Sequence, residues 1–300
     1  MRILLLGKDG QVGWELQRAL SPLGELIAPD LQSLDLEDVD NVRQWVRRHT
    51  PEVIVNAAAY TAVDRAESEP EKARLINADA VGLLAEEAAR LNSWLVHYST
   101  DYVFDGEKSA PYEEDDPARP LSVYGRTKFD GEERIRQQQA RHLIFRTSWV
   151  YAAHGNNFIK TILRLATEKE QLNVVADQYG APTGAELLAD VTALALHRIR
   201  HDAKSEGLSG TYHLVAQGET SWHGYAQYLL SVAAERGLAL KAGPGNVHPI
   251  PTDAYLLPAK RPRNSRLNAT KVSRAFDLTL PDWHEPVSRV VHELLQRGGQ

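Results

Sequence analysis

The chain has 300 residues, a formal net charge of -6 and no cysteine. Its length allows one large domain or two coupled ones, and 43% hydrophobic residues can fill a sizeable core. The negative charge argues against general binding to nucleic acids or anionic membranes, and the missing thiols exclude disulfides, thiolate nucleophiles and cysteine-bound metals. No apolar run approaches the roughly 18 residues of a membrane span, so we expect a cytoplasmic protein.

The first half of the chain alternates short apolar runs with longer amphipathic stretches. Strands are expected at 3–6, 26–28, 53–55, 94–98 and 143–145, and helices at about 12–23, 38–49, 70–91 and 122–139. Apolar strands that alternate with helices predict right-handed βαβ units and a parallel sheet covered on both faces.

The second half is less regular. Helices are expected at about 157–168, 185–201 and 221–236, strands at 172–175 and 211–215, and an ordered loop over the proline-rich segment 241–266. We therefore predict an α/β protein with a Rossmann-type doubly wound parallel sheet and a smaller mixed α/β lobe. The sheet domain would comprise 1–149 and about 184–203, and the lobe about 150–183 and 204–300.

A glycine-rich turn follows the first predicted strand and opens the first predicted helix. Gly7, Gly10 and Gly13 form the pattern G-x-x-G-x-x-G. In this context the first glycine permits the tight turn, the second lets the backbone approach a pyrophosphate, and the third packs the helix against the strand. The helix N-terminus favours phosphate charge. A turn without a ligand is the alternative, but the position favours dinucleotide binding.

The residues after the next two strands suit the rest of a dinucleotide. Asp30 follows the second strand, where an acid can accept hydrogen bonds from the adenosine ribose and repels a 2′-phosphate, which favours NADH. Lys8 can reach a phosphate, so NADPH stays open. The alternative role of Asp30 is to cap a helix or turn. The small residues at 57–59 let a cofactor lie close to the backbone.

Tyr124 and Lys128 form a Y-x-x-x-K element on a predicted helix. Residues four apart share a helix face, and a lysine ammonium beside a tyrosine is expected to lower the phenol pKa from about 10. Tyr124 can then donate a proton to a carbonyl oxygen as hydride reaches its carbon. Ser99 and Thr100 end a strand at the edge where α/β sheets bind ligands, and alternation does not choose between their hydroxyls. An exposed helix pair is the alternative for Tyr124 and Lys128.

Together these motifs resemble the extended short-chain dehydrogenase/reductase superfamily. The chain is similar to its dTDP-4-dehydrorhamnose reductase family over the stretches GKDGQVGWELQRAL, VNAAAYTAVDRAESEP, HYSTDYVFDG, VYGRTK, FRTSWVYAAHGNNF, DQYGAPTGAELLAD and RPRNSRL. The resemblance implies reduction of the C4 ketone of dTDP-4-dehydro-L-rhamnose to dTDP-L-rhamnose with NADPH or NADH, the last step of dTDP-rhamnose biosynthesis.

The resemblance also implies roles for single residues. Tyr124 would donate the proton, Lys128 would hold the nicotinamide ribose, and Thr100 would be the hydroxyl of the triad. Cofactor contacts are also expected from Gly7, Gly10, Gln11, Val12, Gly13, Asp30, Asp35, Leu36, Ala57, Ala58, Ala59, Tyr60, Thr61 and Tyr98. Thr100, Asp101 and Trp149 would meet the sugar.

Two further groups are candidates for the substrate side. Asn156 is a pocket candidate, and Arg261 and Arg263 belong to a basic cluster, 260–266, whose guanidinium groups suit a substrate diphosphate. A solvated basic loop is the alternative for the arginines.

Some members of the family form dimers around magnesium held by glutamates. Glu15, Glu186 and Glu293 stand at the matching positions, and carboxylates suit this cation. Ordinary exposed helix glutamates are the alternative. On this resemblance we expect a homodimer.

Two other activities remain open at this stage. Related sugar-nucleotide 4,6-dehydratases place Asp-Glu after the threonine, whereas here Asp101 is followed by Tyr102, which favours ketone reduction. Another sugar-nucleotide reductase or epimerase is one alternative. The other is a non-catalytic subunit like that of methionine adenosyltransferase, because a fold alone does not prove catalysis.

Overall fold

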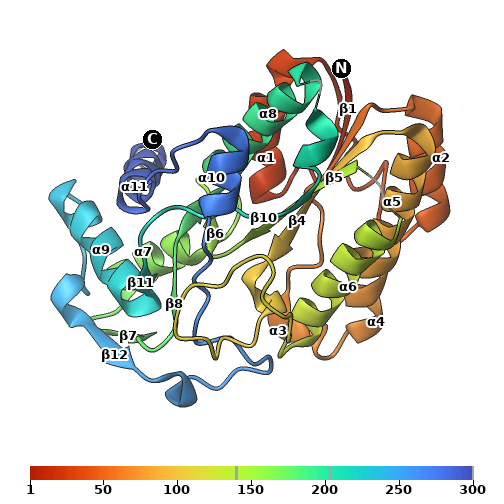
Figure 1. The fold of residues 1–300 in the computed structure, drawn as a ribbon. Helices are drawn as coiled ribbons and strands as arrows, with labels where there is room; N and C mark the ends of the chain where they lie inside the picture. The colour runs from red at the N-terminus through yellow and green to blue at the C-terminus, as the bar shows by residue number, and fades with distance from the viewer. Residues whose placement is uncertain (139–140, 203, 299–300) are drawn as a thin grey trace.

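A six-stranded parallel sheet forms the centre of the computed structural model, which describes residues 1–138, 141–202 and 204–298 (Figure 1). Residues 139–140, 203 and 299–300, which fall in predicted segments, lie outside the described residues. The strand order is β10-β5-β4-β3-β1-β2. The bounds are β1 (Arg2–Leu6), β2 (Glu25–Ile27), β3 (Val53–Asn56), β4 (Trp94–Thr100), β5 (Arg141–Thr147) and β10 (Gly210–His213).

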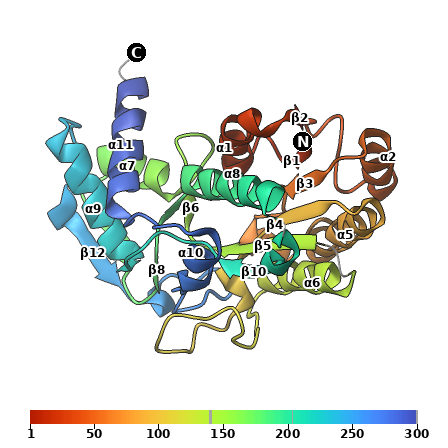
Figure 2. The same cartoon turned by 45° about the horizontal axis from the view of Figure 1, so that its top comes forward.

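Helices cover both faces of this sheet, as predicted. Figure 2 shows α1 (Gln11–Leu20) and α8 (Ala185–His201) on one side, and α5 (Ala80–Leu91) and α6 (Val123–Gln137) on the other. Alternation along β1 sends Ile3 and Leu5 toward Leu188, and Leu4 toward Leu84. Burial on both faces explains why the strands read as continuous apolar runs. The α/β fold class is confirmed.

The chain reverses direction across the sheet at β1. It passes from β1 to β2 on one side, then crosses through α2 (Val39–His49) to β3 on the other side of β1. Connections that leave in opposite directions open a crevice at the carboxyl ends of the two strands, and ligands of open α/β sheets bind there. The glycine turn follows β1 at this point, and Asn56 ends β3.

The smaller lobe has its own core, which includes Ile159, Leu229 and Val287. Its helices are α7 (Phe158–Glu168), α9 (Trp222–Glu235) and α11 (His284–Gly298). Three short strand pairs complete the lobe and link it to the sheet domain: β6 (Val150–Tyr151) with β9 (Thr183–Gly184), β8 (Tyr179–Gly180) with β11 (Thr220–Ser221), and β7 (Leu172–Val175) with β12 (Val247–Ile250).

Several elements differ from the expectations. The proline-rich segment contains β12, so the prediction of a loop throughout 241–266 is wrong. Pro249 fits there because β12 is the edge of a two-stranded sheet, where a missing N–H is tolerated. The predicted helix 70–91 is divided into α4 (Pro70–Arg74), a π-helical turn η2 (Leu75–Asp79) and α5.

The edge strand β10 lies in the segment assigned to the lobe, yet it pairs with β5 in the main sheet. Three α-helices of the described residues lie outside the predicted helix ranges: α3 (Val63–Ala66), α10 (Thr270–Phe276) and α11. Within the described residues, no helix has both the length and the apolar character needed to cross a membrane.

Candidate active site

A cleft of about 960 Å³ lies at the carboxyl ends of β1, β3, β4 and β5. It brings together most residues that the sequence proposed, although they come from distant parts of the chain. The expected residues that line it are Gly7, Gly10, Gln11, Val12, Asp30, Asp35, Leu36, Ala57, Ala58, Ala59, Tyr60, Thr61, Tyr98, Thr100, Asp101, Tyr124, Lys128, Trp149 and Asn156.

The glycine turn after β1 leaves no room for side chains at two of its glycines. Gly7 has a φ of 80°, and a Cβ there would lie 2.6 Å from the Ala58 nitrogen. A Cβ on Gly13 would lie 1.9 Å from the Gly7 oxygen, so Gly13 packs α1 onto the turn. Gly13 does not line the cleft, although a cofactor contact was expected there. Gly10 is the N-cap residue of α1 and has no side chain that could bond the free N–H groups. The N–H groups of the first turn therefore suit a pyrophosphate, and the cleft fits a dinucleotide.

Asp30 caps a turn, which was the alternative to a ribose contact in the sequence analysis. It also lines the cleft. Its Oδ1 accepts hydrogen bonds from the Ser33 nitrogen (2.9 Å) and hydroxyl (2.7 Å), and these bonds hold the pKa of Asp30 below its usual value. The other oxygen lies 4.0 Å from Lys8 Nζ. This end of the cleft therefore presents a carboxylate and an ammonium side by side.

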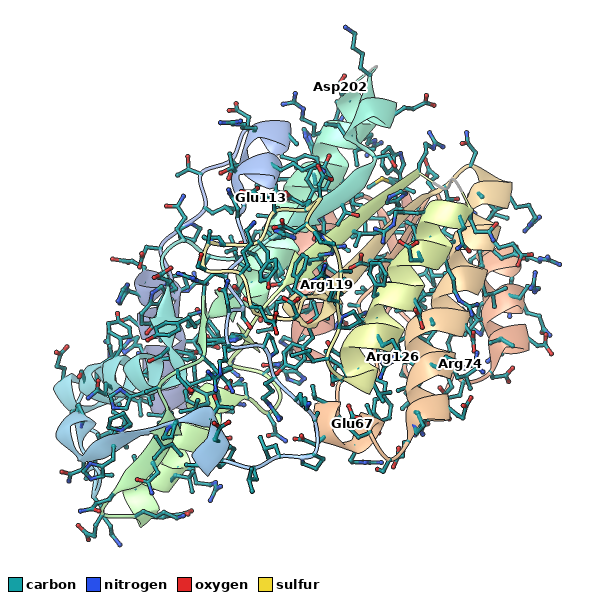
Figure 3. The ribbon with its side chains drawn as sticks, turned by 60° about the horizontal axis from the view of Figure 1, so that its bottom comes forward. Glu67, Arg74, Glu113, Arg119, Arg126 and Asp202 are labelled. Atoms are coloured by element: carbon teal, nitrogen blue, oxygen red, sulfur yellow. The ribbon has the colours of Figure 1, made fainter. Side chains whose placement is uncertain are left out.

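Helix α6 places Tyr124 and Lys128 inside the cleft. Two bonds fasten its first turn: Ser122 Oγ accepts from the Gly125 nitrogen (3.1 Å), and Glu67 Oε1 accepts from the Val123 nitrogen (2.8 Å). Lys128 is 2% exposed. Figure 3 shows Arg126, two residues after Tyr124, on the outer side of the helix. The four-residue spacing therefore faces inward, and the alternative of an exposed pair is wrong.

The electrostatics of the pair differ from the sequence-based expectation. Burial raises the pKa of Tyr124 to about 12. The hydrogen bond with Thr100 opposes the rise, and the charge of Asp101 adds to it. Burial also lowers the pKa of Lys128 to about 8, against the charge of Glu132. The expected lowering of the phenol pKa by a lysine ammonium is thus wrong. Tyr124 remains a protonated phenol at neutral pH.

The two candidate hydroxyls at the end of β4, those of Ser99 and Thr100, have different partners. Thr100 shares a hydrogen bond with Tyr124, and its Oγ1 donates its own proton to Asp101 Oδ1 (3.1 Å). Ser99 faces Glu132, whose pKa it helps to lower. The geometry therefore favours Thr100 as the hydroxyl beside Tyr124. Asp101 is buried, and desolvation raises its pKa to about 6 although Ser265 and Thr100 oppose the rise.

Trp149 enters the cleft from a left-handed backbone conformation. Its φ is 50°, which costs a non-glycine residue about 1 kcal/mol or more. The indole stacks on Trp222 with ring centroids 3.7 Å apart, and a Cβ on Gly180 would lie 2.7 Å from it. Packing on both sides thus fixes a large apolar surface at the cleft wall.

Neither predicted substrate arginine lines the cleft. Arg261 forms a two-pronged ion pair with Asp64, with nitrogen–oxygen distances of 2.8 and 3.1 Å. Arg263 is exposed and lies 3.7 Å from Asp253. Because Ala62 and Val63 do line the cleft, the Asp64–Arg261 pair stands beside its mouth.

The three glutamates proposed for magnesium are not gathered in this chain. Glu15 pairs with Arg18 at 3.6 Å, Glu186 with Arg289, and Glu293 with Arg297 at 2.5 Å. Among residues 1–138, 141–202 and 204–298, no cluster of three or more histidines, aspartates or glutamates could hold a metal ion.

Several cleft residues were not proposed from the sequence. Tyr102 packs edge-on against Tyr124 with centroids 5.6 Å apart, and Ser148 precedes Trp149 in the wall. Their positions beside proposed residues were the available signal. His97, behind Lys128, gave no signal of its own.

The fold and the site together define an NAD(P)-dependent oxidoreductase of the short-chain dehydrogenase/reductase class. The family model described as RmlD substrate binding domain matches residues 1–296. The chain belongs to this family, that of the dTDP-4-dehydrorhamnose reductases.

Similar proteins agree over nearly the whole chain. The dTDP-4-dehydrorhamnose reductases of Shigella flexneri and Escherichia coli (strain K12) are each 53% identical over 298 residues, with 98% of both chains covered. The Bacillus anthracis enzyme in complex with NADP has a TM-score of 0.86 at 34% identity and covers 97% of this chain and 99% of its own. An ortholog from Clostridium acetobutylicum has a TM-score of 0.88 at 35% identity, with coverage of 99% and 100%.

Proposed function

We propose that the protein reduces the C4 ketone of dTDP-4-dehydro-L-rhamnose to dTDP-L-rhamnose with NADPH or NADH. The observation that carries this proposal is that Thr100, Tyr124 and Lys128 line the same cleft as the glycine turn. The relatives at 53% identity support the substrate assignment.

In this proposal the bound nicotinamide supplies the hydride, and the chain supplies orientation and a proton. The hydroxyls of Thr100 and Tyr124 hydrogen-bond the ketone oxygen, and Tyr124 gives its proton to that oxygen. Because its pKa is about 12, the phenol carries its proton before the reaction. Lys128 would hold the nicotinamide ribose, and the first turn of α1 the pyrophosphate. Asp101 would hydrogen-bond sugar hydroxyls, and Trp149 would pack on the ring.

Arg261 and Arg263 are proposed to bind the substrate diphosphate at the cleft mouth. Arg263 is exposed enough to turn toward a ligand, whereas Arg261 would have to share or leave Asp64. The proposed division of labour gives cofactor binding to 1–149 and about 184–203, and sugar-nucleotide binding to about 150–183 and 204–300.

A homodimer is the proposed assembly, with Mg²⁺ held by Glu15, Glu186 and Glu293 across the interface. Each glutamate now pairs with an arginine, so metal binding would exchange these partners. Sedimentation velocity with Mg²⁺ and with a chelator tests this proposal. A dimer of equal stability in both conditions counts against the metal.

NADPH and NADH oxidation with a panel of dTDP-4-keto sugars tests the activity. We expect turnover with dTDP-4-dehydro-L-rhamnose, and NMR of the product identifies a C4 alcohol. Turnover restricted to another 4-keto sugar would assign a different sugar-nucleotide reductase. Cofactor binding without oxidation of any panel member would favour the non-catalytic alternative.

A further inference from the structure

A loop of the smaller lobe lies against the glycine turn of the sheet domain. The loop, 152–157, connects β6 to α7, and the turn, 7–10, connects β1 to α1. His154 Nε2 donates to the Asp9 carbonyl oxygen at 3.0 Å, and the His154 ring stacks on Trp14 with centroids 4.4 Å apart. The lobe therefore contacts the part of the sheet domain that suits a pyrophosphate.

The four carbonyl oxygens of the turn all accept hydrogen bonds from the protein. Those of residues 7, 8, 9 and 10 accept from the Gly10 nitrogen, Gln17 Nε2, His154 Nε2 and the Trp14 nitrogen, respectively. The acceptors of the turn are thus occupied, and the N–H groups at the start of α1 have no partner within the helix. This end of the cleft therefore offers donors to a ligand, as an anion requires.

Gln11 and Asn157 form a further contact between the turn region and the loop. Gln11 is the first residue of α1 and lines the cleft, and Asn157 is the N-cap residue of α7. Asn157 Nδ2 donates to Gln11 Oε1 at 2.9 Å and to the Ala152 carbonyl oxygen at 2.7 Å. Gly155 permits this close approach, because a Cβ there would lie 3.0 Å from Gln11 Cγ.

The bonds of Asn157 determine how the Gln11 amide is oriented. Asn157 Oδ1 accepts from the Lys160 nitrogen at 3.3 Å, so the amide atom that faces Gln11 is the nitrogen. This nitrogen can only donate, and the Gln11 atom that faces it must therefore be the oxygen. Gln11 Nε2, which has two donor hydrogens, is turned away from Asn157. Because Gln11 lines the cleft, these hydrogens are available to a ligand there.

We propose that Asn157 is a positioning residue for the cofactor, which holds the Gln11 amide with its NH₂ group toward the pyrophosphate of NAD(P)H. The NH₂ group adds a side-chain donor to the backbone N–H groups of α1. Asn157 belongs to the smaller lobe, so this lobe contributes to cofactor affinity as well as to sugar-nucleotide binding. The inference rests on the NAD(P)H part of the proposed function and is independent of the sugar that is reduced.

The helix cap formed by Asn157 does not by itself require the contact with Gln11. The cap of α7 uses only Asn157 Oδ1, and a serine or aspartate can supply an equivalent oxygen. The bond to Gln11 uses the nitrogen at the other end of the same amide. Substitutions can therefore keep the cap and change only what faces Gln11 and Ala152.

Two substitutions of Asn157 make this separation. The Asn157→Ser side chain is too short to reach Gln11, whereas Asn157→Asp presents an acceptor, to which the Gln11 NH₂ group turns. The Gln11 oxygen then faces the pyrophosphate. Both variants lose the bond to Ala152, so Asn157→Ser is the matched control. The Kd for NADPH should be about tenfold higher in Asn157→Asp than in Asn157→Ser, as expected for the loss of one hydrogen bond to a charged group.

The same two substitutions in a Gln11→Ala background separate amide orientation from simple charge repulsion. Without an amide to turn, the two double variants should bind NADPH with Kd values within about threefold of each other. A larger difference in this background would show that the new carboxylate repels the phosphates directly, and it overturns the proposal. Equal Kd values for the two single variants also overturn it.

A measurement on the unmodified protein decides the question where an Asn157 variant fails to fold. In ¹⁵N spectra, the side-chain NH₂ signal of Gln11, assigned by its loss in Gln11→Ala, should shift when NADPH is added. It should also shift with ADP-ribose, which has the pyrophosphate but no nicotinamide. A signal that moves with neither ligand overturns the proposal. No sugar nucleotide is present in these experiments, so failure of this proposal and failure of the proposed function are distinguishable.

Discussion

The buried carboxyl group of Asp101 should make the protein less stable at alkaline than at acidic pH. Its pKa in the folded state is about 6, against 3.8 for an ordinary aspartate. The folded protein therefore binds more protons than the unfolded chain between these values, and stability falls as the pH rises through this window. Above the folded pKa the full penalty is about 3 kcal/mol, from roughly 2.2 pKa units at 1.36 kcal/mol each.

Asp101→Asn removes the ionisation and keeps an oxygen that can accept the bond from Thr100 Oγ1. We expect the variant to be more stable than the parent by up to about 3 kcal/mol at pH 8 and by about 1 kcal/mol at pH 4.5. Urea unfolding followed by circular dichroism at both pH values measures the two differences. Activity should fall in the same variant, since Asp101 lines the cleft.

The control for this experiment is Asp30→Asn. Asp30 is exposed and its pKa is lowered by Ser33, so its loss should not stabilise the protein at pH 8. A stability gain for Asp101→Asn that is the same at pH 4.5 and pH 8 would refute the linkage argument. A loss of stability at pH 8 would show that the carboxylate is satisfied in its buried position.

Three further predictions concern the cleft and its mouth. Tyr124→Phe should lower kcat by about 100-fold or more, as expected for a lost general acid, while NADPH still binds by fluorescence titration; near-normal turnover would exclude the proposed role. Gly13→Ala should abolish NADPH binding and lower the urea midpoint of unfolding, because the added Cβ would lie 1.9 Å from a backbone oxygen. Gly245→Ala should change neither quantity, because its added Cβ would have no atom within 4 Å. Arg261→Ala should raise KM for the sugar nucleotide with little change in kcat, and an unchanged KM would remove Arg261 from the diphosphate site.

Local patterns in the sequence predicted the sheet and its covering helices well. The apolar runs of β1, β3, β4 and β5 and the glycine turn are contiguous signals, and each is set by short-range backbone requirements. The pairing of β10 with β5 is a long-range choice that no local pattern encodes. β12 was missed because prolines argue against strands, and only its edge position makes Pro249 acceptable.

The active-site residues were predictable in identity but not in charge state. Spacing alone placed Tyr124 and Lys128 on one face of α6, and the cleft contains both. Their pKa values depend on burial, which tertiary packing creates. The ion pair of Arg261 with Asp64 was not predictable from the sequence either, because the two residues are 197 positions apart in the chain. His97 reads as an ordinary strand residue until Asn56 and Lys128 are seen on either side of it.

The stacked indoles of Trp149 and Trp222 give the protein a built-in optical label. Two transition dipoles 3.7 Å apart in nearly parallel rings couple strongly, so the pair should contribute an exciton couplet to the circular dichroism spectrum. Only Trp149 of the two lines the cleft. A sugar that packs against it would change the coupling without touching the nicotinamide absorbance. Substrate entry and cofactor oxidation can therefore be followed separately in one unlabelled sample.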